Sequence, residues 1–225
     1  MDSQKSWSEL ASSSLLLKAV SSWRKDPESW LEGSFERLPE TVRVNPLRTD
    51  SKWVEEWILE QGGKSVPWFK GSGTAWEMPF SRGLAEGKTR EMLIALHETG
   101  RITRQEIVSM IPVLALQVST GDYVLDMCAS PGSKTTQISE YLGEGGVVFA
   151  NEISNSRVNT LVSNVHRHGS KSAVIINHDG RHLPKMPNRG FDKVLVDAPC
   201  TGSATTRKNP CLLYTSDAAD ERLRV

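Results

Sequence analysis

Residues 122–135, with the sequence DYVLDMCASPGSKT, constrain the fold of this chain more than any other stretch. A short apolar and β-branched run at 123–127 ends near the Pro131-Gly132 turn, and a helix-compatible segment at 135–142 follows it. This order predicts a strand, a tight loop and a helix N-terminus. In an open α/β sheet, cofactors bind at the carboxyl end of the first strand, where backbone N–H groups and the helix dipole converge. The loop is therefore a candidate cofactor site.

Apolar segments alternate with helix-compatible segments from Gly121 onward. We expect strands at 123–127, 147–152, 173–177 and 193–196, and helices at 135–142 and 154–168. The apolar runs are continuous rather than alternating, which is typical of parallel strands that helices cover on both faces. The sequence thus predicts an α/β fold built on a doubly wound, Rossmann-like parallel sheet.

The N-terminal part predicts a small α/β appendage, which we place at 1–100, before a main domain at 101–210. We expect an amphipathic helix at 6–25 that Asp26-Pro27 ends, a short strand at 40–46, and a helix that Asp50 or Ser51 caps. All seven tryptophans lie before residue 77. This favours a tryptophan-stiffened core over a base-stacking, RNA-binding platform, whose aromatic side chains must be exposed.

A capping-box pattern opens the main domain. Thr103 and Glu106 have the spacing at which two side chains satisfy each other's helix-end N–H groups, so we expect a helix to begin here. Pro112 lies inside the apolar stripe that follows, and it predicts a kink or an early end to this helix.

Composition excludes several classes of protein. No apolar run approaches the ~18 residues of a membrane span, and the N-terminus lacks the pattern of a secretory signal. We therefore expect an intracellular protein, in the nucleus or cytoplasm. The three cysteines are too few and too scattered for a disulfide framework or a zinc site, so we expect no metal. The net charge is zero, but residues 154–208 hold nine Lys/Arg against three Asp, an excess of six positive charges.

The loop after the first predicted strand lacks the known phosphate-binding sequence motifs. It contains neither G-x-G-x-x-G nor G-x-x-x-x-G-K-[ST], so a diphosphate cradle is disfavoured. Three carboxylates instead follow the expected strands. Glu152 comes 26 residues after Asp126, near the spacing of a ribose-binding acid, and Asp179 and Asp197 end the next two strands. Together they favour a cationic nucleoside such as S-adenosylmethionine. Each alone is as well explained as a helix cap, and Cys128 as a packed small residue.

The motif DAPCTG at 197–202 carries a second kind of chemistry. Carbon C5 of cytosine is not nucleophilic until a thiolate adds to C6, which calls for a cysteine and for an acidic group near N3. Asp197 and Cys200 are the right residue types at one strand end, and we take them as candidate catalytic residues. The alternative is a turn with an incidental cysteine.

At this point the sequence resembles the Sun-domain RNA cytosine-5 methyltransferases, and most closely their eukaryotic tRNA branch. The resemblance begins at VRVNPLR, from Val42, and runs to Asn209. The segments that carry it are 103–116 (TRQEIVSMIPVLAL), 125–137 (LDMCASPGSKTTQ), 151–157, 177–179 and 197–209 (DAPCTGSATTRKN).

The resemblance implies a site for the methyl donor S-adenosylmethionine, with RNA as the partner, and its eukaryotic tRNA branch implies tRNA. It places Glu152 on the ribose, Asp179 near the adenine and Asp197 beside both the donor and the target base. It implies that Cys200 assists product release, while the family's nucleophile is a cysteine in a later Thr-Cys-Ser motif. The loop residues that it places against the donor are Cys128, Ala129, Ser130, Pro131, Gly132, Ser133 and Lys134.

The C-terminal part departs from the family pattern. No Thr-Cys-Ser occurs in the 225 residues, and Cys211 follows Cys200 too soon to replace it. Residues 211–225 resemble a translated sequencing adapter, so we expect a truncated chain whose fourth strand is an exposed edge and which does not methylate RNA. Two alternatives stay open: Cys200 as the attacking nucleophile, and a non-catalytic RNA-binding scaffold.

Overall fold

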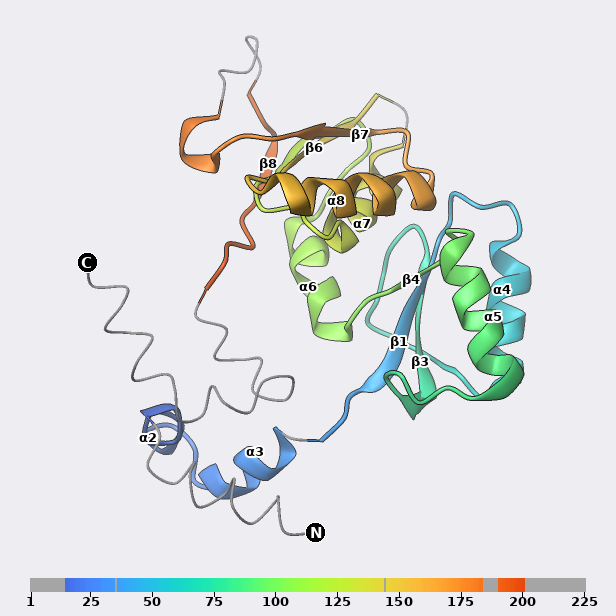
Figure 1. The fold of residues 1–225 in the computed structure, drawn as a ribbon, viewed down its shortest axis with the longest axis vertical. Coiled ribbons are helices and arrows are strands. Elements are labelled where there is room, and N and C mark those ends of the chain that lie inside the picture. Colours follow the sequence, from blue (N-terminus) through green and yellow to red (C-terminus); the bar gives the residue numbers. More distant parts are fainter. Residues whose placement is uncertain (1–14, 35, 144, 184–189, 201–225) are drawn as a thin grey trace. The chain divides into compact units, whose positions relative to one another are not determined.

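The computed structural model describes residues 15–34, 36–143, 145–183 and 190–200 (Figure 1). The chain divides into two compact units, Pro39–Ala198 and a smaller one of Met1–Leu38 with Pro199–Val225. The expectations for residues 1–14 and 201–225, including the tail at 211–225, lie outside the described residues. None of the helices described is long and apolar enough to cross a membrane.

The smaller unit contains two short helices, α2 (Leu15–Ser21) and α3 (Pro27–Gly33). The predicted single helix over 6–25 is wrong at its C-terminal end, because α2 stops at Ser21. Pro27 does not merely end a helix. It is the first residue of α3, a position where its missing N–H group would have no helical partner anyway.

The larger unit begins with an antiparallel sheet in the order β2-β3-β1-β4. Its strands are β1 (Pro39–Val44), β2 (Lys64–Ser65), β3 (Thr74–Ser81) and β4 (Ile102–Arg104). Helices α4 (Ser51–Glu60) and α5 (Gly87–Glu98) lie together on one side of this sheet (Figure 1). Their buried residues Val54, Ile58, Leu93 and Leu96 form one core with Val42 and Trp76. Burying these side chains is the main contribution to the stability of this layer.

The predicted capping box is wrong. Thr103 lies in β4, opposite Arg43 of β1, and helix α6 (Ile107–Leu116) begins only after Glu106. The Glu106 side chain makes no capping hydrogen bond. Asp50 does precede α4, but its carboxylate accepts from Arg101 Nε at 2.6 Å instead of capping the helix. In both places a tertiary contact outweighs a local sequence signal.

The second half of the larger unit is a parallel sheet in the order β7-β6-β5-β8. Its strands are β5 (Tyr123–Asp126), β6 (Val147–Asn151), β7 (Ala173–Ile176) and β8 (Lys193–Leu195). Helix α7 (Ser133–Leu142) links β5 to β6, and α8 (Asn155–His168) links β6 to β7. The strands and helices predicted from the sequence are confirmed to within two residues at each end.

Helices α6, α7 and α8 bury one face of the parallel sheet. Val124 and Val148, which are paired in register, pack with Val113 of α6 and Ile138 of α7, while Ala150 packs against Leu161 of α8. The chain leaves β5 toward β6 and later returns to β8 on the other side of β5. That reversal makes a switch point, where α/β sheets bind ligands.

The segment VRVNPLR fastens the antiparallel sheet to the helices of the parallel sheet. The Arg43 guanidinium is fully buried, lies 3.2 Å from Glu140 Oε1 of α7 and donates to Thr136 Oγ1 at 3.0 Å. His168 at the end of α8 shares the same Glu140 oxygen at 2.9 Å. Asn45 Nδ2 donates to the carbonyls of Gly100 and His168, both at 2.8 Å. The two sheets are therefore joined by buried polar contacts, and β4 carries the first sheet past residue 100.

Tryptophans serve the core only in part. Trp76 is buried and Trp57 packs against the same core, whereas Trp53 and Trp68 are 47% and 43% exposed. An RNA-binding role for residues 1–100 stays a prediction.

Candidate functional site

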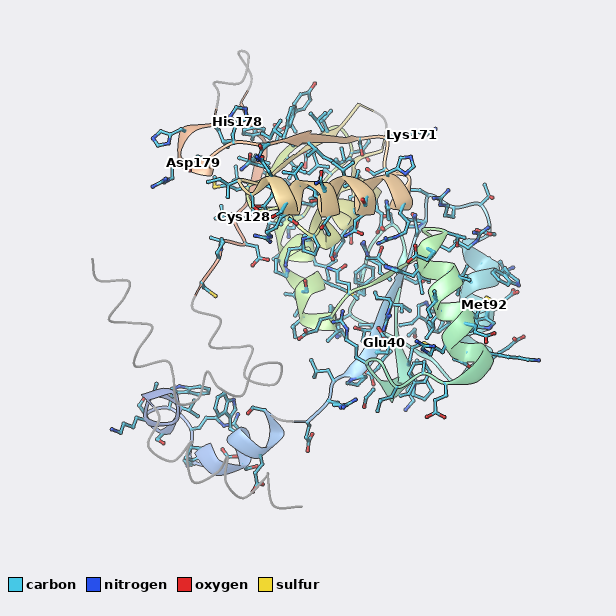
Figure 2. The ribbon with its side chains drawn as sticks, in the orientation of Figure 1. Glu40, Met92, Cys128, Lys171, His178 and Asp179 are labelled. Carbon is cyan, nitrogen blue, oxygen red and sulfur yellow. The ribbon has the colours of Figure 1, made fainter. Side chains whose placement is uncertain are left out.

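The C-terminal ends of the parallel strands form one edge of the sheet, which we call the carboxyl edge. Asp126 of β5 is in register with Ala150 of β6 and with Leu195 of β8. Glu152 therefore follows β6, and Asp197 follows β8, next to the loop that leaves β5. Figure 2 shows Cys128, His178 and Asp179 at this same end of the sheet, with Lys171 at the opposite end. The sequence prediction that the acids meet the loop at one edge agrees with this arrangement.

Asn151 forms hydrogen bonds that connect several strand ends at the carboxyl edge. Its side chain is buried, and its Nδ2 donates to the carbonyls of Met127 and His178, each at 3.0 Å. Its Oδ1 accepts from the His178 backbone N–H at 3.0 Å. One amide thus ties the ends of β5, β6 and β7 together. Sequence reasoning missed Asn151, although a polar residue directly after the apolar run at 147–150 was a signal for it.

The loop at residues 128–134, hereafter the cofactor loop, is held from α8. Arg157 Nη2 donates to the Ser130 carbonyl at 2.8 Å, and Ser130 Oγ donates to the Arg157 carbonyl at 3.0 Å. Asn164 Nδ2 donates to the Pro131 carbonyl at 2.6 Å. The Ser130–Pro131 peptide bond is cis. No sequence pattern distinguishes Arg157 from the other basic residues of its segment.

Gly132 is required where the cofactor loop enters α7. Its φ is +107°, a conformation that other residues rarely adopt, and a Cβ there would lie 3.1 Å from Leu161 Cδ1. Gly132 is the N-cap residue of α7, and no side chain of the described residues caps this helix. The N–H groups of its first turn are thus available to donate hydrogen bonds to an anionic group of a ligand.

Asp126 closes the base of the cofactor loop. Its carboxylate is buried and accepts from Thr135 Oγ1 at 2.7 Å. Burial raises the pKa of Asp126 to about 6, although the hydrogen bond from Thr135 and the charge of Lys134 oppose the rise. Sequence reasoning used this residue only as a spacing reference, so its role at the site was missed.

Cys128 lies among the acids of the carboxyl edge. Burial raises the pKa of its thiol, and the nearby charges of Glu152, Asp126 and Asp197 raise it further. A thiol in such surroundings stays protonated near neutral pH, so Cys128 is not an activated nucleophile. Its half-buried position suits a residue that lines a site without reacting.

Glu152 offers one unsatisfied acceptor. Its side chain is 2% exposed, and its Oε1 accepts from the Ser154 backbone N–H at 2.9 Å, just before α8. Its Oε2 lies 3.3 Å from Arg157 Nη1 but has no hydrogen-bond partner among the described residues. The helix-cap explanation therefore accounts for one oxygen only. The other is a buried acceptor that a ligand hydroxyl would satisfy.

Asp179 and Asp197 each form an ion pair with a basic side chain, Arg181 and Lys134 respectively. Arg181 donates to the Asp179 carboxylate, with its Nη2 at 2.6 Å from Oδ2, and this hydrogen bonding holds the pKa of Asp179 well below its usual range. The Arg181 backbone N–H also donates to Asp179, so this residue does cap the short helix at Gly180–His182. Asp197 Oδ2 accepts from Lys134 Nζ at 2.6 Å. One partner of each pair is exposed, Arg181 at 81% and Asp197 at 58%, so a ligand can reach either pair.

Cys200 is exposed and belongs to the smaller unit. It follows Asp197 by three residues in the chain. Its assignment as a catalytic residue, together with Asp197, stays a prediction.

The residues present fit S-adenosylmethionine better than a phosphate-bearing nucleotide. The carboxyl edge gathers four acids around the cofactor loop, which suits a sulfonium cation and opposes phosphates. The orphaned Glu152 Oε2 suits a ribose hydroxyl. No group of three His, Cys, Asp or Glu that could hold a metal ion occurs in the part of the chain that the structure describes.

The proteins that this chain is similar to have names that describe RNA methyltransferases. The sequence profile described as 16S rRNA methyltransferase RsmB/F matches residues 113–221. A human 28S rRNA (cytosine(4447)-C(5))-methyltransferase is 33% identical over 191 residues, which cover 85% of this chain and 23% of that protein. The tRNA (cytosine(49)-C(5))-methyltransferase of Pyrococcus abyssi is 33% identical over 185 residues, which cover 82% of this chain and 57% of that protein.

A solved structure extends the similarity to the fold. A methyltransferase homolog protein from Pyrococcus horikoshii matches with a TM-score of 0.63 and 28% identity, over 87% of this chain and 62% of that one. The chain thus spans 23% of the human relative and 57% of the archaeal tRNA enzyme.

Proposed function

We propose that this chain belongs to the RsmB/F family of RNA (cytosine-C5) methyltransferases and that its carboxyl edge binds S-adenosylmethionine. We further propose that the protein methylates carbon C5 of cytosine in RNA, with tRNA as the expected substrate. Relatives with rRNA and with tRNA in their names both match, so the class of RNA is part of the proposal. An RNA substrate of this kind fits a protein of the nucleus or cytoplasm.

The observation that carries the cofactor proposal is the buried Oε2 of Glu152, which forms an ion pair with Arg157 but has no hydrogen-bond partner among the described residues. We assign Glu152 to the ribose hydroxyls and Asp179 to the adenine edge. The cofactor loop would lie along the methionine part, whose carboxylate the first turn of α7 can accept. These loop residues are Cys128, Ala129, Ser130, Pro131, Gly132, Ser133 and Lys134. When bound, the cofactor supplies an electrophilic methyl group.

Asp197 and Cys200 are our candidates for the groups that act on the base. Asp197 is close enough to Lys134 to be held beside the cofactor loop, and a carboxyl group there can hydrogen-bond the N3 side of a cytosine. We assign the Cys200 thiol to release of the methylated product. The family's attacking cysteine in a Thr-Cys-Ser motif is not among the 225 residues.

The cofactor proposal is tested by calorimetric titration of the purified chain with S-adenosylmethionine. We expect binding to the unaltered chain. Glu152→Gln removes the charge of a buried acceptor, so it should weaken binding about tenfold or more. The matched control is Glu91→Gln on the exposed face of α5, which should bind as the unaltered chain does.

Equal binding by Glu152→Gln and the unaltered chain would contradict the ribose assignment. An absence of any binding, together with retained RNA binding, would favour the non-catalytic scaffold over an enzyme.

The role of Cys200 is tested by trapping on RNA that contains 5-azacytosine, which captures a cysteine attached to C6. If Cys200 only assists product release, this chain, which lacks the Thr-Cys-Ser cysteine, forms no adduct. If Cys200 is the nucleophile, the unaltered chain forms an adduct and Cys200→Ala forms none. A stable adduct that depends on Cys200 would therefore overturn our assignment.

A further inference from the structure

A cationic cavity is lined by part of the cofactor loop but by none of the acids of the carboxyl edge. It has a volume of about 360 Å³, and its walls come from β4 and α5 of the antiparallel sheet layer and from the start of α7 and the end of α8. Pro131, Gly132 and Ser133 of the cofactor loop line it. Glu152, Asp179 and Asp197 do not. This cavity is therefore distinct from the carboxyl edge, although the two share a loop.

Three arginines line this cavity, which we call the arginine cavity. They are Arg82, Arg104 and Arg167, and no Asp or Glu of the described residues lines it. Arg104 is neutralised by the buried Glu40 carboxylate behind it. Arg82 has no hydrogen bond or ion pair within the described ranges, and Arg167 Nη2 donates at 2.6 Å to an amide oxygen, Oδ1 of Asn164. Two guanidinium charges are thus left without a carboxylate.

The pKa of His97 responds to the positive charge of these arginines. His97 lines the arginine cavity. Burial lowers its pKa, and the charges of Arg167 and Arg104 lower it further. A neutral imidazole flanked by guanidinium groups is a surface that favours an anion and disfavours any added cation.

We propose that the arginine cavity binds a backbone phosphate of the RNA substrate. This inference rests on the proposed function, because RNA is the polyanion that such an enzyme meets. Arginine guanidinium groups bind phosphate oxygens in bidentate geometry, and such contacts position a nucleic acid without reading its sequence. Arg82 follows β3 of the antiparallel sheet and Arg167 belongs to α8, so a phosphate bound by both would contact both layers of the larger unit. S-adenosylmethionine carries no phosphate and does not compete for this site.

The test measures RNA affinity against salt concentration. A single-stranded RNA oligonucleotide of mixed sequence is titrated with the full chain by fluorescence anisotropy at several salt concentrations. We compare the unaltered chain with Arg82→Gln, Arg167→Gln and the double variant. The control is Arg90→Gln, an equally exposed arginine of α5 that does not line the cavity. Thermal melting checks that each variant folds.

Loss of one phosphate contact should reduce the slope of log K against log salt by about 0.7, so the double variant, which removes both arginines from the single bound phosphate, should lose about that much. Arg90→Gln should keep the slope of the unaltered chain. Calorimetry with S-adenosylmethionine reads the proposed function separately, and both arginine variants should bind the cofactor normally.

Equal slopes in the double variant and the control would overturn the phosphate assignment, and so would an unaltered chain that binds no RNA. A cavity that binds inorganic pyrophosphate through Arg82 and Arg167 while RNA binding ignores them would also overturn it. Loss of cofactor binding in the unaltered chain would count against the proposed function, not against this site.

Discussion

Charged pairs occur in two regions of the larger unit, and burial separates them. Arg43 and Glu140 join the antiparallel sheet to α7 with side chains that are 0% and 1% exposed. At the carboxyl edge, Lys134 and Asp197 form a pair that is 17% and 58% exposed. The first pair is surrounded by protein. The second shares its surroundings with solvent and, in our proposal, with a ligand.

The difference shows which charges hold the fold and which are available for binding. Removing one partner of a buried pair leaves an uncompensated charge, which is costly even where the pair itself adds little stability. An exposed pair is screened by water, and its cation can be exchanged for a ligand. We therefore expect substitutions at the Arg43 contact to change stability, and substitutions at the carboxyl edge to change cofactor binding.

Arg43→Met should produce the largest loss of stability. It leaves Glu140 buried without its cation and removes the hydrogen bond to Thr136 Oγ1 in the first turn of α7. Breaking a buried pair typically costs about 3–5 kcal/mol. Urea denaturation followed by circular dichroism measures the change.

The matched control for Arg43→Met neutralises both partners. Arg43→Met with Glu140→Gln removes the stranded charge and keeps an acceptor for His168, so it should recover most of the lost stability. If the double variant is as unstable as Arg43→Met, the stranded charge is not the cause.

Asp126 should make the larger unit less stable as pH rises. Its folded-state pKa is about 6, above the ordinary aspartate pKa of 3.8, so the folded state holds its proton more tightly than the unfolded state. The resulting stabilisation is complete below pH 3.8 and is lost as pH rises through 6. A shift of about two units corresponds to a loss on the order of 3 kcal/mol.

Asp126→Asn tests that pH dependence, because it keeps an acceptor for Thr135 and removes the titration. Its unfolding free energy, measured between pH 4 and pH 7, should fall less steeply than that of the unaltered chain. Parallel profiles for the two proteins would show that Asp126 titrates normally.

Lys134→Met should have the smallest effect on stability. Its partner Asp197 is more than half exposed, and pairs of this kind contribute about 0–1 kcal/mol. A loss of stability as large as that of Arg43→Met, measured in the same urea titration, would remove the distinction between the two regions.

The parallel sheet was predictable because each of its elements carries its own signal. The apolar runs at 123–126 and 147–151 end in turn residues, and α7 and α8 repeat at helical spacing between them. The antiparallel sheet was harder. Strand β3 and helix α5 were missed, and β4 was mistaken for a capping box, because three residues paired with β1 leave almost no local pattern. Pairing partners that are far apart in sequence decide such strands.

The residues of the candidate site also differ in whether a local sequence signal marks them. Glu152, Asp179 and the cofactor loop were predictable from strand ends and a Pro-Gly turn. Arg157 was not, because its importance lies in a contact with Ser130 that only the folded chain creates. Asn151 had a signal, as a polar residue after an apolar run, but its contacts with Met127 and His178 also arise only in the folded chain. Glu152 Oε2 lies 3.3 Å from Arg157 Nη1 but has no hydrogen-bond partner among the described residues. This too depends on where Arg157 lies, and no sequence pattern encodes it.

The most direct test of the central claim is photolabelling of the chain with S-adenosylmethionine that carries a radioactive methyl group. Trypsin releases residues 105–134, which contain the cofactor loop, as one peptide. We predict that the label lies on this peptide and that excess unlabelled cofactor removes it. Label that unlabelled cofactor does not displace, or that lies instead on peptides 53–64 or 71–82 of the antiparallel sheet layer, would contradict the proposal that the carboxyl edge binds the methyl donor.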